Sequence, residues 1–178
     1  MIVLVMGAAG CGKSTIASLL AERLGYAFLD ADQLHDAASK AKMAAGTPLD
    51  EDDRRPWLEA IHAVLEQHSL AQQTLVVACS ALRRSHRQVL RRNIDELRVV
   101  FLDGDPQLLA RRIRQRHAHF FPAALLADQL AILEPPTGEQ ALRLDIGEPP
   151  SALVERIVDW LRLPMPPPAA RNGQDIGR

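Results

Sequence analysis

Short apolar runs alternate with longer amphipathic stretches along most of the chain. The first run, IVLVM, is apolar at every position, which is typical of a parallel strand covered by helices on both faces. Segments such as TIASLLAERL and PWLEAIHAVLEQH instead repeat apolar residues at helical spacing, and Gly25 follows the first of them as a helix-ending residue. The runs expected to form strands are 2–6, 27–30, 75–79, 98–102 and 141–145.

This alternation of strand and helix predicts an α/β fold with three layers, in which helices cover both faces of a mainly parallel sheet. An all-helical bundle is the alternative, and the repeated short β-branched runs argue against it. A length of 178 residues favours a single domain. We expect that domain over residues 1–163, followed by a flexible tail over 164–178, because the prolines and polar residues there can neither continue a helix nor bury much apolar surface.

Composition and charge limit the classes of partner that the protein is expected to bind. Hydrophobic residues make up 47% and charged residues 24%, as in an ordinary globular protein, and the formal net charge of -1 argues against nucleic acid or an anionic membrane as partner. No apolar run reaches membrane-span length, and the N-terminus lacks the basic flank of a signal peptide, so we expect a cytoplasmic protein. Cys11 and Cys79 are expected to be reduced thiols, and no His or Cys spacing resembles a zinc site.

A phosphate-binding loop follows the first expected strand. Residues 7–14 read GAAGCGKS, a full match to GxxxxGK[ST], and an amphipathic helix comes next. Glycines let the backbone aim its N–H groups at phosphate oxygens, and the helix N-terminus adds a positive dipole. Lys13 is expected to hold the β- and γ-phosphates of ATP, and Ser14 to ligate Mg²⁺. The alternative is a glycine-rich turn that binds nothing. The expected nucleotide-binding residues are Gly7, Gly10, Cys11, Gly12, Lys13, Ser14 and Thr15.

The loop alone does not separate small kinases from GTP switches or motor ATPases. The guanine-reading NKxD pattern is absent, since Asn93 is followed by Ile94 and Asp95. The chain is also too short for the added domains of most motor ATPases. These observations leave the kinases that act on small molecules.

Two carboxylates follow the second expected strand, in the segment FLDADQLH. Side chains alternate along an extended segment, so we expect Asp30 and Asp32 to face the same side, at the sheet edge where ligands of parallel sheets bind. Asp32 is predicted to orient or deprotonate the attacking hydroxyl, and Asp30 to serve the Mg²⁺ shell. The alternative is that Asp32 only caps the next helix.

Several blocks together closely resemble the bacterial gluconate kinases. They are GAAGCGKST, FLDADQLH, KMAAGTPLDEDDRRPWL, CSALRRSHR, RQRHAHFF and LADQLAILEPP, and the resemblance covers roughly residues 5–150. It implies a P-loop kinase fold, phosphorylation of D-gluconate to 6-phosphogluconate with ATP and Mg²⁺, and a homodimer. The sequence departs from the family pattern at Asp36, Ser39 and Ala118. We expect the sheet order 2-3-1-4-5 and a mobile lid near residues 111–125.

The remaining site assignments follow from these blocks. Arg112 and Arg116 are four positions apart, so on one helix face they are predicted to grip the transferring phosphoryl group. An RNA-binding patch is the competing interpretation of this basic segment, but only two aromatic residues lie nearby for stacking. Arg87 is expected to bind the carboxylate of the acceptor, which the resemblance supports. The expected acceptor contacts are Asp32, His35, Ser80, Arg87 and His119.

Two alternatives to a gluconate kinase stay open. One is a shikimate-type or nucleotide-type kinase of the same fold, and the other is a nucleotide-gated regulator that transfers no phosphoryl group.

Overall fold

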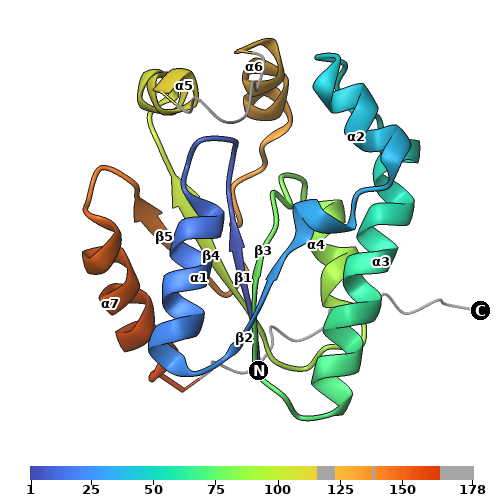
Figure 1. Ribbon diagram of the computed structural model, residues 1–178. Helices are drawn as coiled ribbons and strands as arrows, with labels where there is room; N and C mark the ends of the chain where they lie inside the picture. Colours follow the sequence, from blue (N-terminus) through green and yellow to red (C-terminus); the bar gives the residue numbers. More distant parts are fainter. Residues whose placement is uncertain (116–122, 138, 165–178) are drawn as a thin grey trace, which may run out of the picture.

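The structure, a computed structural model, describes residues 1–115, 123–137 and 139–164. Figure 1 shows a central sheet with helices on both sides. The strands are β1 (Ile2–Met6), β2 (Ala27–Asp30), β3 (Leu75–Ala78), β4 (Leu97–Asp103) and β5 (Ala141–Asp145). The α-helices are α1 (Lys13–Leu24), α2 (Ala37–Ala44), α3 (Glu51–Leu70), α4 (Arg84–Arg91), α5 (Pro106–Gln115), α6 (Ala123–Ile132) and α7 (Pro150–Leu161), and a short 3-10 helix, η1, spans Ala31–Leu34.

The sheet has the order β2-β3-β1-β4-β5, and every neighbouring pair is parallel. The α/β fold class and the strand order expected from sequence are therefore confirmed. β1 lies at the centre, where Ile2 pairs with Leu75 on one side and Leu97 on the other. All five of its residues are buried, which explains why this run is apolar throughout.

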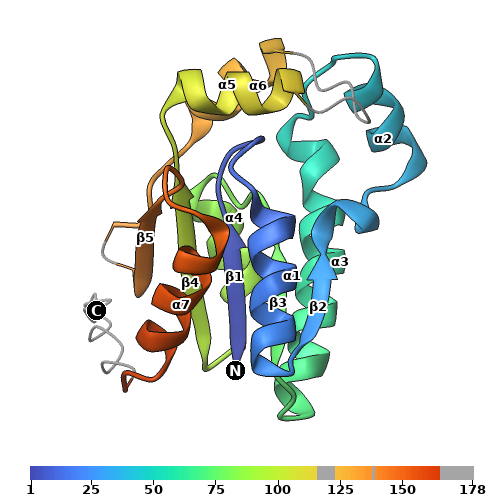
Figure 2. The same cartoon turned by 60° about the vertical axis from the view of Figure 1, so that its left-hand side comes forward.

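Successive residues of β1 pack alternately into two separate hydrophobic cores, one on each face of the sheet. Val3 and Val5 point to the face covered by α1 and α7, whereas Ile2 and Leu4 point to the face covered by α3 and α4. Figures 1 and 2 show these helix pairs on opposite sides of the sheet. The alternation follows from the two-residue period of a strand, and it fixes the sheet between two helical layers.

The ends of two helices are set by particular residues. Gly25 ends α1 in a left-handed conformation with φ 69°, as the sequence predicted. Asp50 begins α3, because its side chain accepts the Asp53 N–H while the Asp53 carboxylate accepts the Asp50 N–H. This reciprocal capping box lets α3 start well before Trp57, and so it brings the charged first turn of α3 toward the carboxyl end of the sheet.

Three helices gather beyond the carboxyl ends of the strands. Both views show α5 and α6 above this edge of the sheet and α2 at the same end, on the side of α3. Ligands of parallel sheets bind at this edge. Among the described residues, no helix combines the length and the apolar character needed to cross a membrane.

Candidate active site

The phosphate-binding loop turns sharply between β1 and α1. Gly10 has φ +81°, and a Cβ added there would lie 2.9 Å from the Leu109 carbonyl oxygen and 3.0 Å from an Ile113 side-chain carbon. Gly12 has φ +94° and is the N-cap residue of α1. Both positions therefore require glycine, one because of close packing and both because of backbone conformation.

The loop suits an anion. The N-cap residue of α1 is Gly12, which has no side chain to cap the helix, and the first turn of α1 holds no acidic residue, so within this described segment no carboxylate competes for the amide groups. The Lys13 ammonium group donates a hydrogen bond to the Ala8 carbonyl, 3.2 Å away, and thus stays over the loop. Backbone donors, a helix dipole and a lysine together match the needs of nucleotide phosphates.

The cysteines contribute no reactive thiol to this loop or to the strand beside it. Cys11 and Cys79 are both free and buried. Burial raises the pKa of the Cys11 thiol, although the nearby Lys13 charge works against this, and burial raises the pKa of Cys79 to about 12. Both thiols are therefore protonated at neutral pH.

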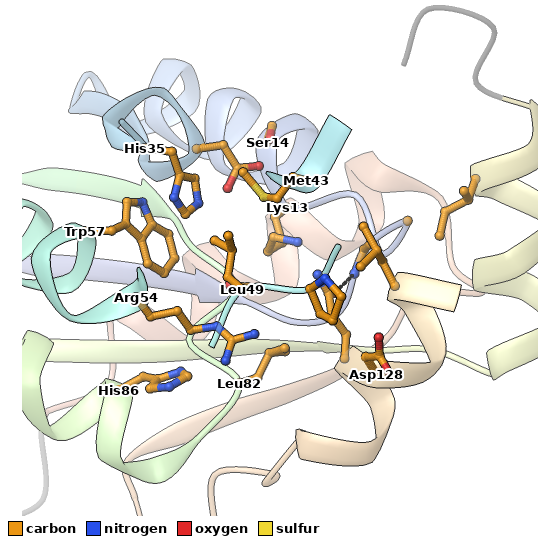
Figure 3. A pocket seen from close by; sticks show the side chains of 18 of the residues that line it. Lys13, Ser14, His35, Met43, Leu49, Arg54, Trp57, Leu82, His86 and Asp128 are labelled. Carbon is orange, nitrogen blue, oxygen red and sulfur yellow. Dashed lines mark hydrogen bonds between the residues drawn. The ribbon is translucent and has the colours of Figure 1, made fainter. Parts of the chain in front are cut away.

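A cavity of about 250 Å³ opens beside the loop, at the carboxyl end of the sheet. Figure 3 shows side chains from several elements converging on it. Of the residues predicted from sequence, the cavity is lined by Gly10, Gly12, Lys13, Ser14, Asp32, His35 and Ser80. The structure therefore brings the phosphate-binding loop and three of the expected acceptor residues, Asp32, His35 and Ser80, to one place.

Other predicted residues do not line this cavity. Gly7, Cys11, Thr15, Asp30, Arg87 and Arg112 lie outside its lining. Arg112 lies on α5, and its Nη2 donates to the Ile146 carbonyl at 2.9 Å. Arg116, Ala118 and His119 lie outside the described residues, as does the middle of the expected lid.

The expected alternation of Asp30 and Asp32 is wrong. The chain leaves the extended conformation at Ala31 and enters η1, and the Asp30 carboxylate caps this turn by accepting the Asp32 N–H at 3.1 Å. Asp32 nevertheless lines the cavity together with Lys13 and Ser14. The alternative role, capping the following helix, falls to Asp36, whose carboxylate accepts the Ser39 N–H at 2.6 Å.

His35 is held flat against a tryptophan. Its ring stacks on Trp57 with 4.3 Å between centroids and 10° between planes, and the Trp57 indole N–H donates to the Ala31 carbonyl at 2.8 Å. Burial lowers the pKa of His35, while the Asp32 charge partly opposes this. His35 is therefore a neutral imidazole with fixed orientation at neutral pH.

The structure does not bring Arg87 to the cavity. Its side chain is 2% exposed, and its guanidinium binds the Glu139 carboxylate through Nε and Nη2 and donates from Nη1 to the carbonyls of Ala81 and Leu82. With these partners Arg87 has no free edge for an acceptor carboxylate. It instead holds the turn after β3, where Ala81 adopts φ 42° between Ser80 and Leu82.

Several cavity residues were missed in the sequence. They come from α2 and the loop after it, from α3, from the turn after β3 and α4, and from α5 and α6: Met43, Pro48, Leu49, Arg54, Trp57, Leu82, His86, Ile113, Leu125, Asp128 and Gln129. Arg54 is the clearest omission, because it lies three positions before Trp57 and therefore on the same helix face. The signal available in the sequence was that Arg54 follows three acidic residues at the start of a helix whose later positions are apolar.

α6 contacts the phosphate-binding loop directly. The Gln129 side-chain oxygen accepts the Ala9 N–H at 2.7 Å, across 120 positions of sequence. Asp128, the preceding residue, also lines the cavity. Among the described residues, no group of three or more His, Cys, Asp or Glu side chains forms a ready metal site. A divalent cation would therefore need ligands from its substrate, as Mg²⁺ commonly does with phosphates.

Comparisons with known proteins agree with this geometry. The family model for shikimate kinase matches residues 9–130. A gluconokinase of Gluconobacter oxydans is 40% identical over 157 residues, covering 88% of each chain. The thermoresistant gluconokinase of Escherichia coli is 34% identical over 163 residues, covering 90% of this chain and 93% of its own.

The chain belongs to the gluconokinase family of P-loop kinases. A solved gluconokinase structure from Sinorhizobium meliloti has 40% sequence identity and a TM-score of 0.81, and the match covers 89% of this chain and 90% of that one. Family membership makes the protein a kinase that uses ATP. It also accounts for the phosphate-binding loop, the cavity beside it and the helices above them as parts of one enzyme.

Proposed function

We propose that this gluconokinase-family protein transfers the γ-phosphoryl group of ATP to D-gluconate and forms 6-phospho-D-gluconate. The observation that carries the proposal is that one cavity has the phosphate-binding loop on one side and the positively charged Arg54 on another side (Figure 3). Gluconate is an open chain with a reacting hydroxyl at one end and a carboxylate at the other. Relatives named gluconokinase support this acceptor over shikimate or a nucleotide.

Catalysis rests mainly on positioning and charge. The loop amides and Lys13 bind the β- and γ-phosphates, with Gly7, Cys11 and Thr15 completing the loop's framework. The Ser14 hydroxyl lines the cavity beside Lys13, where it would hold Mg²⁺. That ion, when bound, neutralises charge on the phosphates. Asp30 is a less suitable ligand than the sequence indicated, because its carboxylate already caps η1.

Asp32 is proposed to act on the acceptor hydroxyl. It lines the cavity next to the loop, so its carboxylate can accept a hydrogen bond from the attacking group and take up its proton. His35 and Ser80 line the same cavity and are proposed to contact the other hydroxyl groups. The stack on Trp57 fixes the His35 ring before the acceptor binds, which lowers the entropy lost on binding.

Arg54 is proposed to bind the acceptor carboxylate in place of Arg87. Its side chain is 18% exposed and lines the cavity, and a guanidinium matches a carboxylate with two parallel hydrogen bonds. Arg87 satisfies its own donors within the protein. The carboxylate of gluconate therefore has a better partner in Arg54.

Further expectations remain proposals. Arg112, Arg116 and His119 are proposed to approach the phosphates or the acceptor when the lid over 111–125 closes. A homodimer and a cytoplasmic location are also proposed. The two free, buried thiols fit a reducing compartment, and light scattering of the purified protein would test the dimer.

A coupled assay of ADP release tests the function. We expect turnover with gluconate well above that with shikimate or nucleoside monophosphates. Lys13→Ala is expected to lower kcat by roughly 10²-fold or more without loss of folding, because it removes a charge aimed at the phosphates. A preference for shikimate would support the other kinase type. Little turnover with any acceptor would support a nucleotide-gated regulator.

A further inference from the structure

Glu51, which does not line the cavity, contacts three basic groups at its edge. Its Oε1 accepts a hydrogen bond from Arg54 Nη1 at 2.9 Å and lies 3.3 Å from Arg83 Nε. Its Oε2 lies 3.0 Å from His86 Nε2. Two of these partners, Arg54 and His86, line the cavity. One carboxylate in the first turn of α3 thus touches both basic side chains at this side of the pocket.

The hydrogen bonds of His86 define its tautomer. The backbone N–H of Arg83 points to His86 Nδ1 at 3.4 Å, so Nδ1 is an acceptor and the proton lies on Nε2, which donates to Glu51. The side chain is buried, and both ring nitrogens are used inside the protein. His86 therefore presents no donor to the cavity and acts as a rigid wall beside Arg54 (Figure 3).

The charges in this cluster leave one positive charge near the cavity. Burial lowers the pKa of His86, although Glu51 works in the opposite direction, and the positive charges of Arg54 and Arg83 lower it further. With His86 neutral, two arginine cations face one carboxylate. Without Glu51 the two guanidinium groups would repel each other, and Arg54 would be free to occupy other rotamers.

We infer that Glu51 is a positioning residue for the acceptor: its carboxylate holds the Arg54 guanidinium toward the cavity and fixes His86 as the wall beside it. The inference rests on the proposed function in that the acceptor carries a carboxylate. Glu51 touches neither the phosphate-binding loop nor Asp32, so its removal affects acceptor binding and leaves nucleotide binding and the chemical step intact.

The chain offers a matched control in the same turn of α3. Asp52 pairs with Arg55 at 2.7 Å, again three positions apart, but both side chains are exposed and neither lines the cavity. Asp52→Asn removes the same first-turn charge and an equivalent ion pair. Any difference between Glu51→Gln and Asp52→Asn therefore reports the contacts of Glu51 with Arg54, Arg83 and His86.

Steady-state kinetics on both variants test the inference. We expect Glu51→Gln to raise the KM for gluconate about tenfold or more, equivalent to about 1.4 kcal/mol of binding free energy. The KM for ATP and kcat should stay within a few-fold, and Asp52→Asn should resemble the wild type. Loss of the Glu51 hydrogen bond should also lower the His86 pKa in an NMR titration, with no change in Asp52→Asn.

Equal gluconate KM values in the two variants would overturn the inference, and so would a parallel rise in the KM for ATP. If Glu51→Gln fails to fold, Glu51→Asp keeps the charge at the helix start but withdraws it from Arg54, and the same rise in KM is expected. Turnover by the wild-type protein tests the proposed function by itself, independently of the Glu51 variants. If another carboxylate acceptor is preferred, the proposed substrate fails and the comparison is made with that acceptor; a preferred neutral acceptor overturns both.

Discussion

The Arg87 guanidinium binds the Glu139 carboxylate through two nitrogen atoms, Nη2 at 2.8 Å and Nε at 2.9 Å. The pair joins the start of α4 to the segment before β5. The third nitrogen, Nη1, donates to the carbonyls of Ala81 and Leu82, so the same side chain also holds the turn that carries Ser80 and Leu82 into the cavity. Arg87 thus shapes the acceptor side without reaching it.

Arg87→Ala is expected to destabilise the protein by about 3–5 kcal/mol, because it empties the site of a fully buried side chain and leaves the Glu139 carboxylate, only 14% exposed, without its partner. Urea unfolding would measure the change. Arg92→Ala is a suitable control, since Arg92 forms an ion pair with Glu59 in which both side chains are 48% exposed, and a loss within about 1 kcal/mol is expected there. Normal stability combined with a raised KM for gluconate would restore the direct role that the sequence indicated for Arg87.

The strands could be predicted from sequence because both faces of the sheet are covered. Ile2 to Met6 are all fully buried, so every position of β1 must be apolar and the run is visible without an alignment. β2 and β5 have the expected bounds. β3 ends at Ala78, one residue early, and β4 is longer by one residue at each end, where backbone pairing and apolar character do not stop together.

The site was predictable where its residues are contiguous. Lys13 and Ser14 belong to one local motif whose backbone conformation follows from its glycines. Arg54 and His86 line one cavity, and both contact Glu51, only because the first turns of α3 and α4 lie close together, and no local sequence pattern reports that arrangement. The role of Arg87 depended on Glu139, which lies 52 positions away.

Asp32→Asn is expected to lower kcat by roughly 10²–10⁴-fold while ATP binding stays within a few-fold, because the amide keeps the shape but cannot take up a proton. ADP release and a separate ATP titration would measure this. Asp30→Ala provides the contrast. It removes the cap of η1, so a loss of about 1 kcal/mol in stability with kcat largely kept is expected. A preserved kcat in Asp32→Asn would remove Asp32 from the catalytic residues.

The lowered pKa values of two buried histidines, His35 and His86, predict how the stability of the protein depends on pH. Burial lowers the pKa of both His35 and His86 below the ordinary value of 6.5, so the unfolded chain binds protons more readily than the folded one. The free energy of unfolding should therefore fall as the pH drops through 6.5 and should level off, for these groups, below their folded pKa values. Urea unfolding at several pH values would show the slope.

His86→Gln should flatten part of that slope, since it removes one of the two groups. His68→Gln, on the half-buried face near the end of α3, serves as the control. An unchanged slope in His86→Gln would show that His86 does not lose proton affinity on folding.

The end of α7 predicts where the chain can be shortened. Arg98 donates to the carbonyls of Trp160 and Leu163, at 3.3 and 2.9 Å, and its guanidinium lies 5.6 Å from the centre of the Trp160 ring. Removing residues 165–178 keeps these contacts, so melting temperature and activity should be nearly unchanged. Removing residues from 162 onward takes away the Leu163 carbonyl and should lower stability by about 1–3 kcal/mol. A drop of several degrees in the shorter deletion would contradict the expectation of an undocked tail.

Residues 36–49, which comprise α2 and most of the loop after it, form one side of the acceptor cavity and make polar contacts with the neighbouring segments. Lys42 pairs with Asp53 and Lys40 donates to the Gln33 carbonyl, while Met43, Pro48 and Leu49 face the cavity. None of residues 36–49 belongs to either hydrophobic core, so we expect that this segment can be exchanged as a unit between kinases of this family with the phosphate-binding loop left intact. New acceptor preferences can evolve, or be engineered, in that segment while ATP use is inherited unchanged.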